Sequence, residues 1–143
     1  MQRDNYKIAE GKLYNYKKNI LRIQNLALEI EKIKNDTYSI GAVGYEERIS
    51  GTTLITSSVE NEIIRRDEKI TVLERRKKQL EYEMQQIENV LEFLSDEESK
   101  IIRERYFNGK TYLQMTVDFP YSIQGMSSAV KKIVKKIAGA LIF

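Results

Sequence analysis

Apolar residues recur at helical spacing along the first third of the chain. Over residues 4–35 they lie three and four positions apart, which places them on one stripe of a single long helix. The stripe consists of Tyr6, Ala9, Leu13, Tyr16, Ile20, Ile23, Ala27 and Ile30. Four more apolar residues are expected to widen this face beyond a narrow seam. They are Leu21, Leu26, Leu28 and Ile33.

A second long helix is predicted over residues 58–93. Its apolar positions alternate steps of four and three from Val59 to Leu94, a heptad seam that only Arg66 and Lys77 interrupt. Because a single helix with such a face is marginal in water, the two seams are expected to bury each other. The economical arrangement is a long antiparallel, coiled-coil-like helical hairpin, which dimerisation would double. Residues 36–58 contain three glycines and no helical period, so they predict a loop or extended linker.

After Leu94, residues that begin or end helices become frequent, and they predict three short helices with tight turns. Ser95 with Glu98 and Thr111 with Gln114 are capping boxes, each of which marks the start of a helix. The first helix is expected to end at Asn108-Gly109 and the second at about Asp118, before Phe119-Pro120-Tyr121.

Ser122 can cap the last of these helices. Its predicted apolar positions are Ile123, Met126, Val130, Ile133, Val134 and Ile137. The sequence therefore predicts an all-α fold with two domains, a helical hairpin over 1–93 with its linker at 36–58 and a small helix-turn-helix over 94–143.

Positive charge is concentrated near the C-terminus, although the net charge of the chain is only +3. From Phe119 to Phe143 there are four lysines and no acidic residue. The second helix of a helix-turn-helix fits the major groove of DNA, so the outer face of helix 122–137 is the candidate interface. Base edges are within reach of Gln124, Ser127, Ser128 and Lys131. Further along the helix, Lys132, Lys135 and Lys136 are placed to contact phosphates. Thr111 and Ser122 lie at helix N-termini, whose backbone N–H groups favour a phosphate oxygen.

Composition argues against catalysis and against a membrane. The chain has no cysteine and no histidine, so the usual metal ligands and the usual neutral-pH base are missing. With no glycine-rich phosphate loop either, we expect no enzyme activity, no metal and no cofactor. Charged residues interrupt the N-terminus early and no run of about 18 apolar residues occurs, so no signal peptide and no membrane helix are expected and the compartment is the cytoplasm.

One stretch resembles the sigma factor region that reads the upstream promoter element. The similarity lies in Leu94-Ser-x-x-Glu, in Arg105-Tyr-Phe-Asn-Gly109, and in Thr111-Tyr-x-Gln. The whole chain is similar to small phage regulators of the RinA and ArpU type, which join such a domain to a helical region and activate late genes. This resemblance adds Arg105, Lys110 and Gly125 to the candidate DNA-binding residues. Phe119-Pro120 departs from the family's usual turn, and lysines and serines stand where it has arginines, which implies a different base preference.

The leading hypothesis is a sequence-specific transcriptional regulator of phage or prophage origin that binds double-stranded DNA through residues 111–137. The long helices would form a homodimer or contact RNA polymerase. An alternative is an oligomeric packaging protein similar to small terminase subunits, which also join a helix-turn-helix to coiled-coil elements. A third reading is a protein-interaction module that has lost DNA binding.

Overall fold

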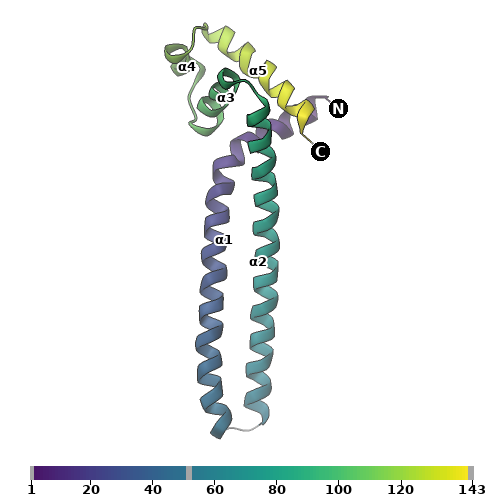
Figure 1. The fold of residues 1–143 in the computed structure, drawn as a ribbon, viewed down its shortest axis with the longest axis vertical. Helices are drawn as coiled ribbons and strands as arrows, with labels where there is room; N and C mark the ends of the chain where they lie inside the picture. Colours follow the sequence, from purple (N-terminus) through teal and green to yellow (C-terminus); the bar gives the residue numbers. More distant parts are fainter. Residues whose placement is uncertain (1, 51–52, 142–143) are drawn as a thin grey trace. The chain divides into compact units, whose positions relative to one another are not determined.

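The chain is all-helical, as the sequence predicted. The computed structural model describes the backbone of residues 2–50 and 53–141 and the side chains of residues 4–36 and 58–141. The described backbone contains helices and no strand. In chain order the elements are α1 (Gln2–Ser50), α2 (Thr53–Phe93), α3 (Asp96–Ile102), the π-helical turn η1 (Arg103–Phe107), α4 (Tyr112–Asp118) and α5 (Ile123–Ala140) (Figure 1). None of the helices described is long and apolar enough to cross a membrane.

The chain divides into two compact units. Unit 1 contains residues 1–20 and 82–143, and unit 2 contains residues 21–81. This division differs from the expected boundary between residues 93 and 94. The reason is that the start of α1 and the end of α2 share one hydrophobic core with the short helices, so the last fifty residues are not compact by themselves.

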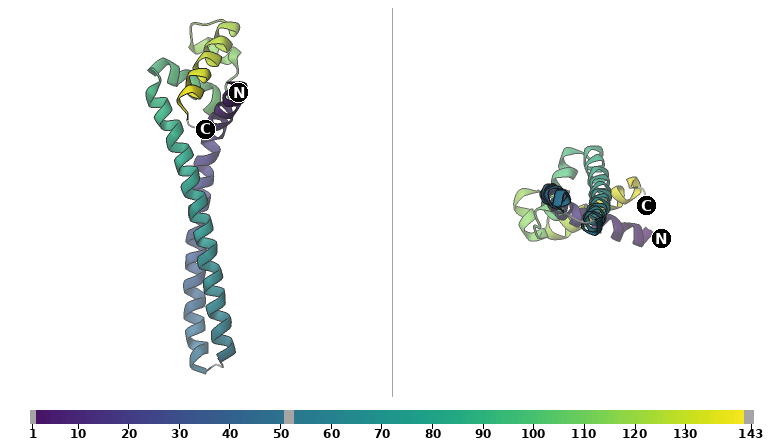
Figure 2. Two further views of the ribbon diagram at one scale, coloured as in Figure 1. Left: turned by 90° about the vertical axis from the view of Figure 1, so that its right-hand side faces the viewer. Right: turned by 90° about the horizontal axis from the view of Figure 1, so that it is seen from below.

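Unit 2 is built from the two long helices alone. Residues 21–36 of α1 and residues 58–81 of α2 lie side by side and run in opposite directions (Figure 2). Their buried contacts join Ile30 and Ile33 to Ile70, with Leu73 packed alongside. An ion pair of 3.6 Å between Lys34 and Glu74 lies at the edge of this core.

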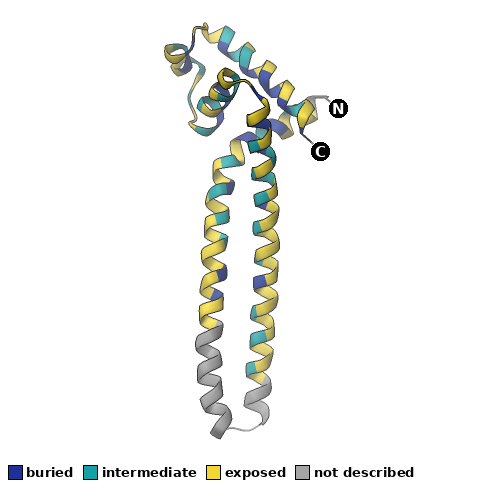
Figure 3. Ribbon diagram, in the orientation of Figure 1, coloured by how far each residue is buried: buried dark blue, intermediate teal, exposed yellow. Residues whose placement is uncertain are grey.

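The heptad seam predicted in α2 is confirmed by burial. Between residues 58 and 80, the seam positions are buried or half-buried and all the others are exposed (Figure 3). These positions are Val59, Ile63, Arg66, Ile70, Leu73, Lys77 and Leu80. Arg66 and Lys77 lie on the seam because their long aliphatic stems can pack while their charged ends reach Glu62 and Glu81.

The apolar stripe of α1 is narrower than predicted. Leu21 and Leu28 are 56% and 63% exposed, and Ala27 is exposed too, so their assignment to the buried face is wrong. Leu21 follows the buried Asn19 by two residues and Leu28 follows the half-buried Leu26 by two, which turns each leucine about 200° around the helix from that position. The seam also holds a polar residue that hydrophobic patterning misses, because Asn19 is only 6% exposed.

The predicted linker over residues 36–58 is also wrong. The structure continues α1 to Ser50 and begins α2 at Thr53, and residues 51 and 52 lie outside the described backbone. Helix can extend through this stretch because it contains no proline. Gly41 and Gly44 each cost about 1 kcal/mol of helix propensity relative to alanine, which lowers helix stability without forbidding it.

The core of unit 1 collects apolar residues from every helix in it. Ala9 and Leu13 of α1 are completely buried there, together with Ile102 of α3. The other buried members are Ile87, Val90, Leu91, Leu94, Ile101, Tyr106, Met115, Phe119, Met126, Val130, Ile133, Val134, Ile137 and Leu141. This shared core fixes how α5 is held and which of its faces stays exposed.

Candidate nucleic-acid interface

The capping box that opens α3 forms as predicted and also anchors α5. Ser95 Oγ accepts a hydrogen bond from the backbone N–H of Glu98 at 3.2 Å, and Glu98 Oε1 accepts one from the N–H of Ser95 at 3.0 Å. Lys136 of α5 donates to the same carboxylate at 3.1 Å. The bond from the Ser95 backbone and the nearby ammonium of Lys136 lower the pKa of Glu98. Lys136, which the sequence placed among the phosphate-binding residues, is therefore paired with a carboxylate of α3.

The turn η1 ties the short helices to α1. The phenol of buried Tyr106 donates to Glu10 Oε2 at 2.8 Å, and burial raises the pKa of Tyr106 above its ordinary value. Tyr16 of α1 stacks on Phe107 with 4.6 Å between ring centroids. The helical segment then ends at Phe107 with Asn108 as its C-cap, and Gly109 follows with a φ of 67°, a conformation that suits glycine, so the predicted stop at Asn108-Gly109 is confirmed.

Helix α4 has the predicted ends. The Thr111 hydroxyl accepts from the N–H of Gln114 at 3.2 Å, and the Gln114 side chain accepts from the N–H of Thr111 at 2.9 Å. The helix stops at Asp118, and residues 119–122 connect it to α5. Phe119 and Met115 are buried, so α4 is fixed to the core while this short connection sets where α5 begins.

Helix α5 begins at the predicted cap and has two distinct faces. Ser122 Oγ accepts from the N–H of Gly125 at 3.0 Å. The buried face is made of Met126, Val130, Ile133, Val134 and Ile137. Ile123, which the sequence assigned to this core, is instead 50% exposed because it lies in the first turn, ahead of the first buried residue.

The opposite face of α5 presents most of the predicted base-reading and phosphate-binding residues. The exposed ones are Gln124, Ser128, Lys131, Lys132 and Lys135. At 100° per residue, Gln124, Lys131 and Lys135 lie within about 40° of one another, so they form one stripe. Ser127 is half-buried at the edge of this face. Gly125 is also half-buried, and an added Cβ there would meet Ser122 Oγ at 3.1 Å.

The lysines on the exposed face of α5 differ from the predicted site residue Lys110 in their ion pairing. Within the described part of the chain, no carboxylate pairs with Lys131, Lys132 or Lys135. Lys110 is an ion-pair partner of Glu104 and, at 3.2 Å, of Asp118. The hydrogen bond to Glu104 is the larger cause of its raised pKa.

Three further predicted site residues have roles inside the fold. The Arg105 guanidinium lies 4.0 Å from the centroid of the Tyr112 ring and donates to the carbonyl of Lys110 at 3.0 Å. Thr111 and Ser122 use their hydroxyls as helix caps. The structure thus brings the α5 residues together on one open face, whereas Arg105 and Lys110 hold the turn before α4.

A groove beside this face involves residues that the sequence analysis missed. It measures about 700 Å³ and lies between the first turns of α1 and the second half of α5. Its lining is Asn5, Tyr6, Lys7, Lys131, Lys135, Ala138 and Gly139. The basic charge of Lys7 is visible in the sequence, but no local pattern connects it to Lys131 and Lys135, which lie more than a hundred residues later in the chain.

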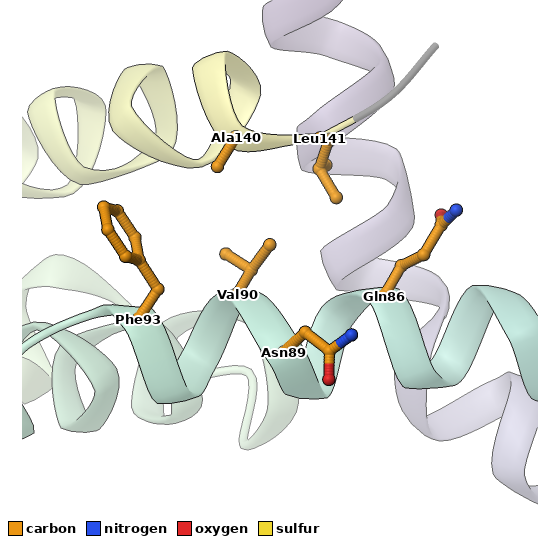
Figure 4. A pocket seen from close by; sticks show the side chains of 6 residues that line it. All are labelled: Gln86, Asn89, Val90, Phe93, Ala140 and Leu141. Carbon is orange, nitrogen blue, oxygen red and sulfur yellow. The ribbon is translucent and has the colours of Figure 1, made fainter.

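A second hollow lies away from these lysines. It measures about 270 Å³ and lies between α2 and the end of α5 (Figure 4). Val90, Phe93 and Leu141 give it an apolar wall, with the amides of Gln86 and Asn89 at its rim. Among the described residues, no group of three or more acidic side chains is placed to hold a metal ion.

Comparison with known proteins gives one match. A family profile described as "Protein of unknown function (DUF722)" matches residues 14–139, which include most of α1 and all of α2, α3 and α4. No curated protein and no solved structure matches the chain. Because the profile spans most of the sequence, the chain belongs to the family described as protein of unknown function (DUF722).

Proposed function

We propose that this protein is a sequence-specific, DNA-binding transcriptional regulator of phage or prophage origin that acts in the cytoplasm. In this proposal α4 and α5 are the two helices of a helix-turn-helix, and the long helices α1 and α2 form an antiparallel hairpin. The observation that carries the proposal is the exposed face of α5, where Gln124, Ser128 and Lys131 lie on the side opposite a fully buried apolar face.

The dimensions of α5 fit the major groove. Its 18 residues span about 27 Å at 1.5 Å per residue. Gln124 and Lys135 are then about 16 Å apart, compared with a major groove about 12 Å wide. A helix inserted by its first turns would bring Gln124 and Ser128 to base edges. The lysines further along would face the phosphates that border the groove.

Electrostatics supports the same orientation. Lys131, Lys132 and Lys135 have no carboxylate partner among the described residues, so bringing phosphates to them breaks no ion pair. Neutralising phosphates with such lysines releases condensed counterions, which is the main source of sequence-independent affinity. Glutamine can donate and accept together at an adenine edge and lysine can donate to guanine, so Gln124 and Lys131 supply the sequence preference.

The resemblance to sigma region four and to RinA- and ArpU-type phage regulators supports a role in transcription. A homodimer formed through the long helices would present two copies of α5 to half-sites about one helical turn apart, or a multiple of that. RNA polymerase is the further partner that the resemblance implies.

Selection from a random duplex library tests the proposal. We expect the wild-type protein to recover a motif that Lys131→Glu abolishes. Lys69→Glu is the matched control, because Lys69 is an exposed lysine of α2 and its reversal changes the net charge equally. The control should recover the wild-type motif. Failure of the wild-type protein to enrich any motif at low salt would refute sequence-specific binding.

A further inference from the structure

The groove between the start of α1 and the second half of α5 is an unusual place for three lysines to meet. Lys7 comes from α1, and Lys131 and Lys135 come from two successive turns of α5. The residues that line the groove include no carboxylate. In the described part of the chain, Lys7 likewise has no ion-pair partner. Three like charges gathered without compensation favour binding of a polyanion.

The same groove continues the face proposed to read DNA. Lys131 and Lys135 belong to both, since they lie on the stripe that begins at Gln124 and they also line the groove. A DNA strand bound along the stripe from Gln124 to Lys135 would therefore lie beside Lys7. The groove is open and about 700 Å³ in volume, and its polar rim includes Asn5, whose amide can donate to a phosphate oxygen.

We propose that the first turns of α1 form a second phosphate-binding element, in which Lys7 and Asn5 hold the backbone of the same duplex whose bases face α5. The inference rests on the proposed function. It assigns to α1 a direct contact with DNA in addition to its packing role in unit 1. Because a phosphate contact carries no base information, Lys7 should raise affinity for every duplex equally.

The expected size follows from counterion release. Each phosphate contact contributes about 0.9 to the slope of log affinity against log salt concentration. Removing one contact should therefore flatten the slope by about 0.9 and weaken binding about 8-fold in 0.1 M salt. The selected motif should be unchanged, in contrast to the effect expected for Lys131→Glu.

The test measures duplex affinity by fluorescence anisotropy over a range of salt concentrations. Lys7→Gln should show the flatter slope, and Lys7→Arg should restore it because the charge returns. Lys18→Gln is the matched control, since Lys18 is an exposed lysine of α1 outside the groove, and it should behave as wild type. If Lys7→Gln and Lys18→Gln have equal slopes while wild type binds, the inference fails and the proposed function stands. If the wild-type protein binds no duplex, the proposed function itself fails.

A second arm separates a duplex from a small free anion. Sodium tripolyphosphate is titrated into the wild-type protein and into Lys7→Gln by calorimetry. Weak or absent binding to both supports the assignment to a nucleic-acid backbone. Saturable binding that the substitution removes would identify a site for a small free phosphate compound and would overturn the assignment.

Discussion

Leu13 offers a direct test of whether the start of α1 belongs to the same unit as α5. Its side chain is 0% exposed, within the core that contains Val130 and Val134. Leu13→Ala removes three buried carbons, which costs about 2.4 kcal/mol in transfer free energy at 0.8 kcal/mol each. The cavity left behind adds to this, so we expect a loss of about 3–4 kcal/mol in the free energy of unfolding.

Leu28 is the matched control, because it is the same residue type in the same helix but 63% exposed. Leu28→Ala should cost less than about 1 kcal/mol, since little of its side chain leaves water on folding. Urea unfolding followed by circular dichroism measures both. With a slope of about 2 kcal/mol per molar urea, Leu13→Ala should lower the midpoint by about 1.5–2 M.

Amide hydrogen exchange supplies the second readout for Leu13→Ala. If α1 and α5 share one core, the amides of Val130 and Val134 should exchange faster in this variant, although they lie more than a hundred residues away in sequence. Equal urea midpoints for the two leucine variants, or unchanged protection in α5, would refute the shared unit.

Two further predictions concern caps and ion pairs. Glu98→Gln should destabilise the protein at neutral pH. Because the folded-state pKa of Glu98 is lowered, the wild-type advantage is present above the ordinary value of 4.5 and lost as pH falls through the lower, folded value. Urea midpoints of both proteins between pH 7 and pH 3 check this, and a constant difference would contradict it. Ser122→Ala should lower stability by about 1 kcal/mol through loss of the cap of α5, whereas Ser128→Ala, an exposed mid-helix control, should change it by less than about 0.5 kcal/mol in the same assay.

Local features of the sequence predicted the short helices well. A capping box depends on residues three positions apart, so those of Ser95 and Thr111 could be identified without knowledge of the fold, and Ser122 could be identified as a simple N-cap. The heptad seam of α2 was predictable for the same reason, because its periodicity is a property of one helix. The buried face of α5 followed from its spacing too, with Ile123 as the exception.

The errors arose where composition was used in place of geometry. Glycines between residues 36 and 58 suggested a loop, yet helix propensity differences of about 1 kcal/mol do not decide the conformation of a segment that neighbouring turns extend into. Leu21 and Leu28 suggested a wider buried face, although their angle on the helix points them away from the seam. Hydrophobicity alone therefore overestimated the core.

The candidate interface could be predicted only in part, because pairing between distant charges is not visible in sequence. Lys110 and Lys136 looked equivalent to the lysines on the exposed face of α5. In the structure, Lys110 donates a hydrogen bond to Asp118, eight residues away in the sequence, and Lys136 donates one to Glu98, 38 residues away in the sequence. Lys7 shows the opposite case, since only the tertiary fold brings it to the groove with Lys131.

The pairing of charges also explains how a chain with a net charge of only +3 can present a basic surface. Lys135 and Lys136 are adjacent, but successive residues are turned by about 100° on a helix. Lys136 consequently reaches Glu98 of α3, while Lys135 lines the groove with Lys7. In the proposed function, a strongly acidic partner is attracted by Lys7, Lys131 and Lys135, which have no carboxylate partner among the described residues, rather than by the average charge of the molecule. The proposed partner is therefore argued from the position of each carboxylate rather than from the net charge.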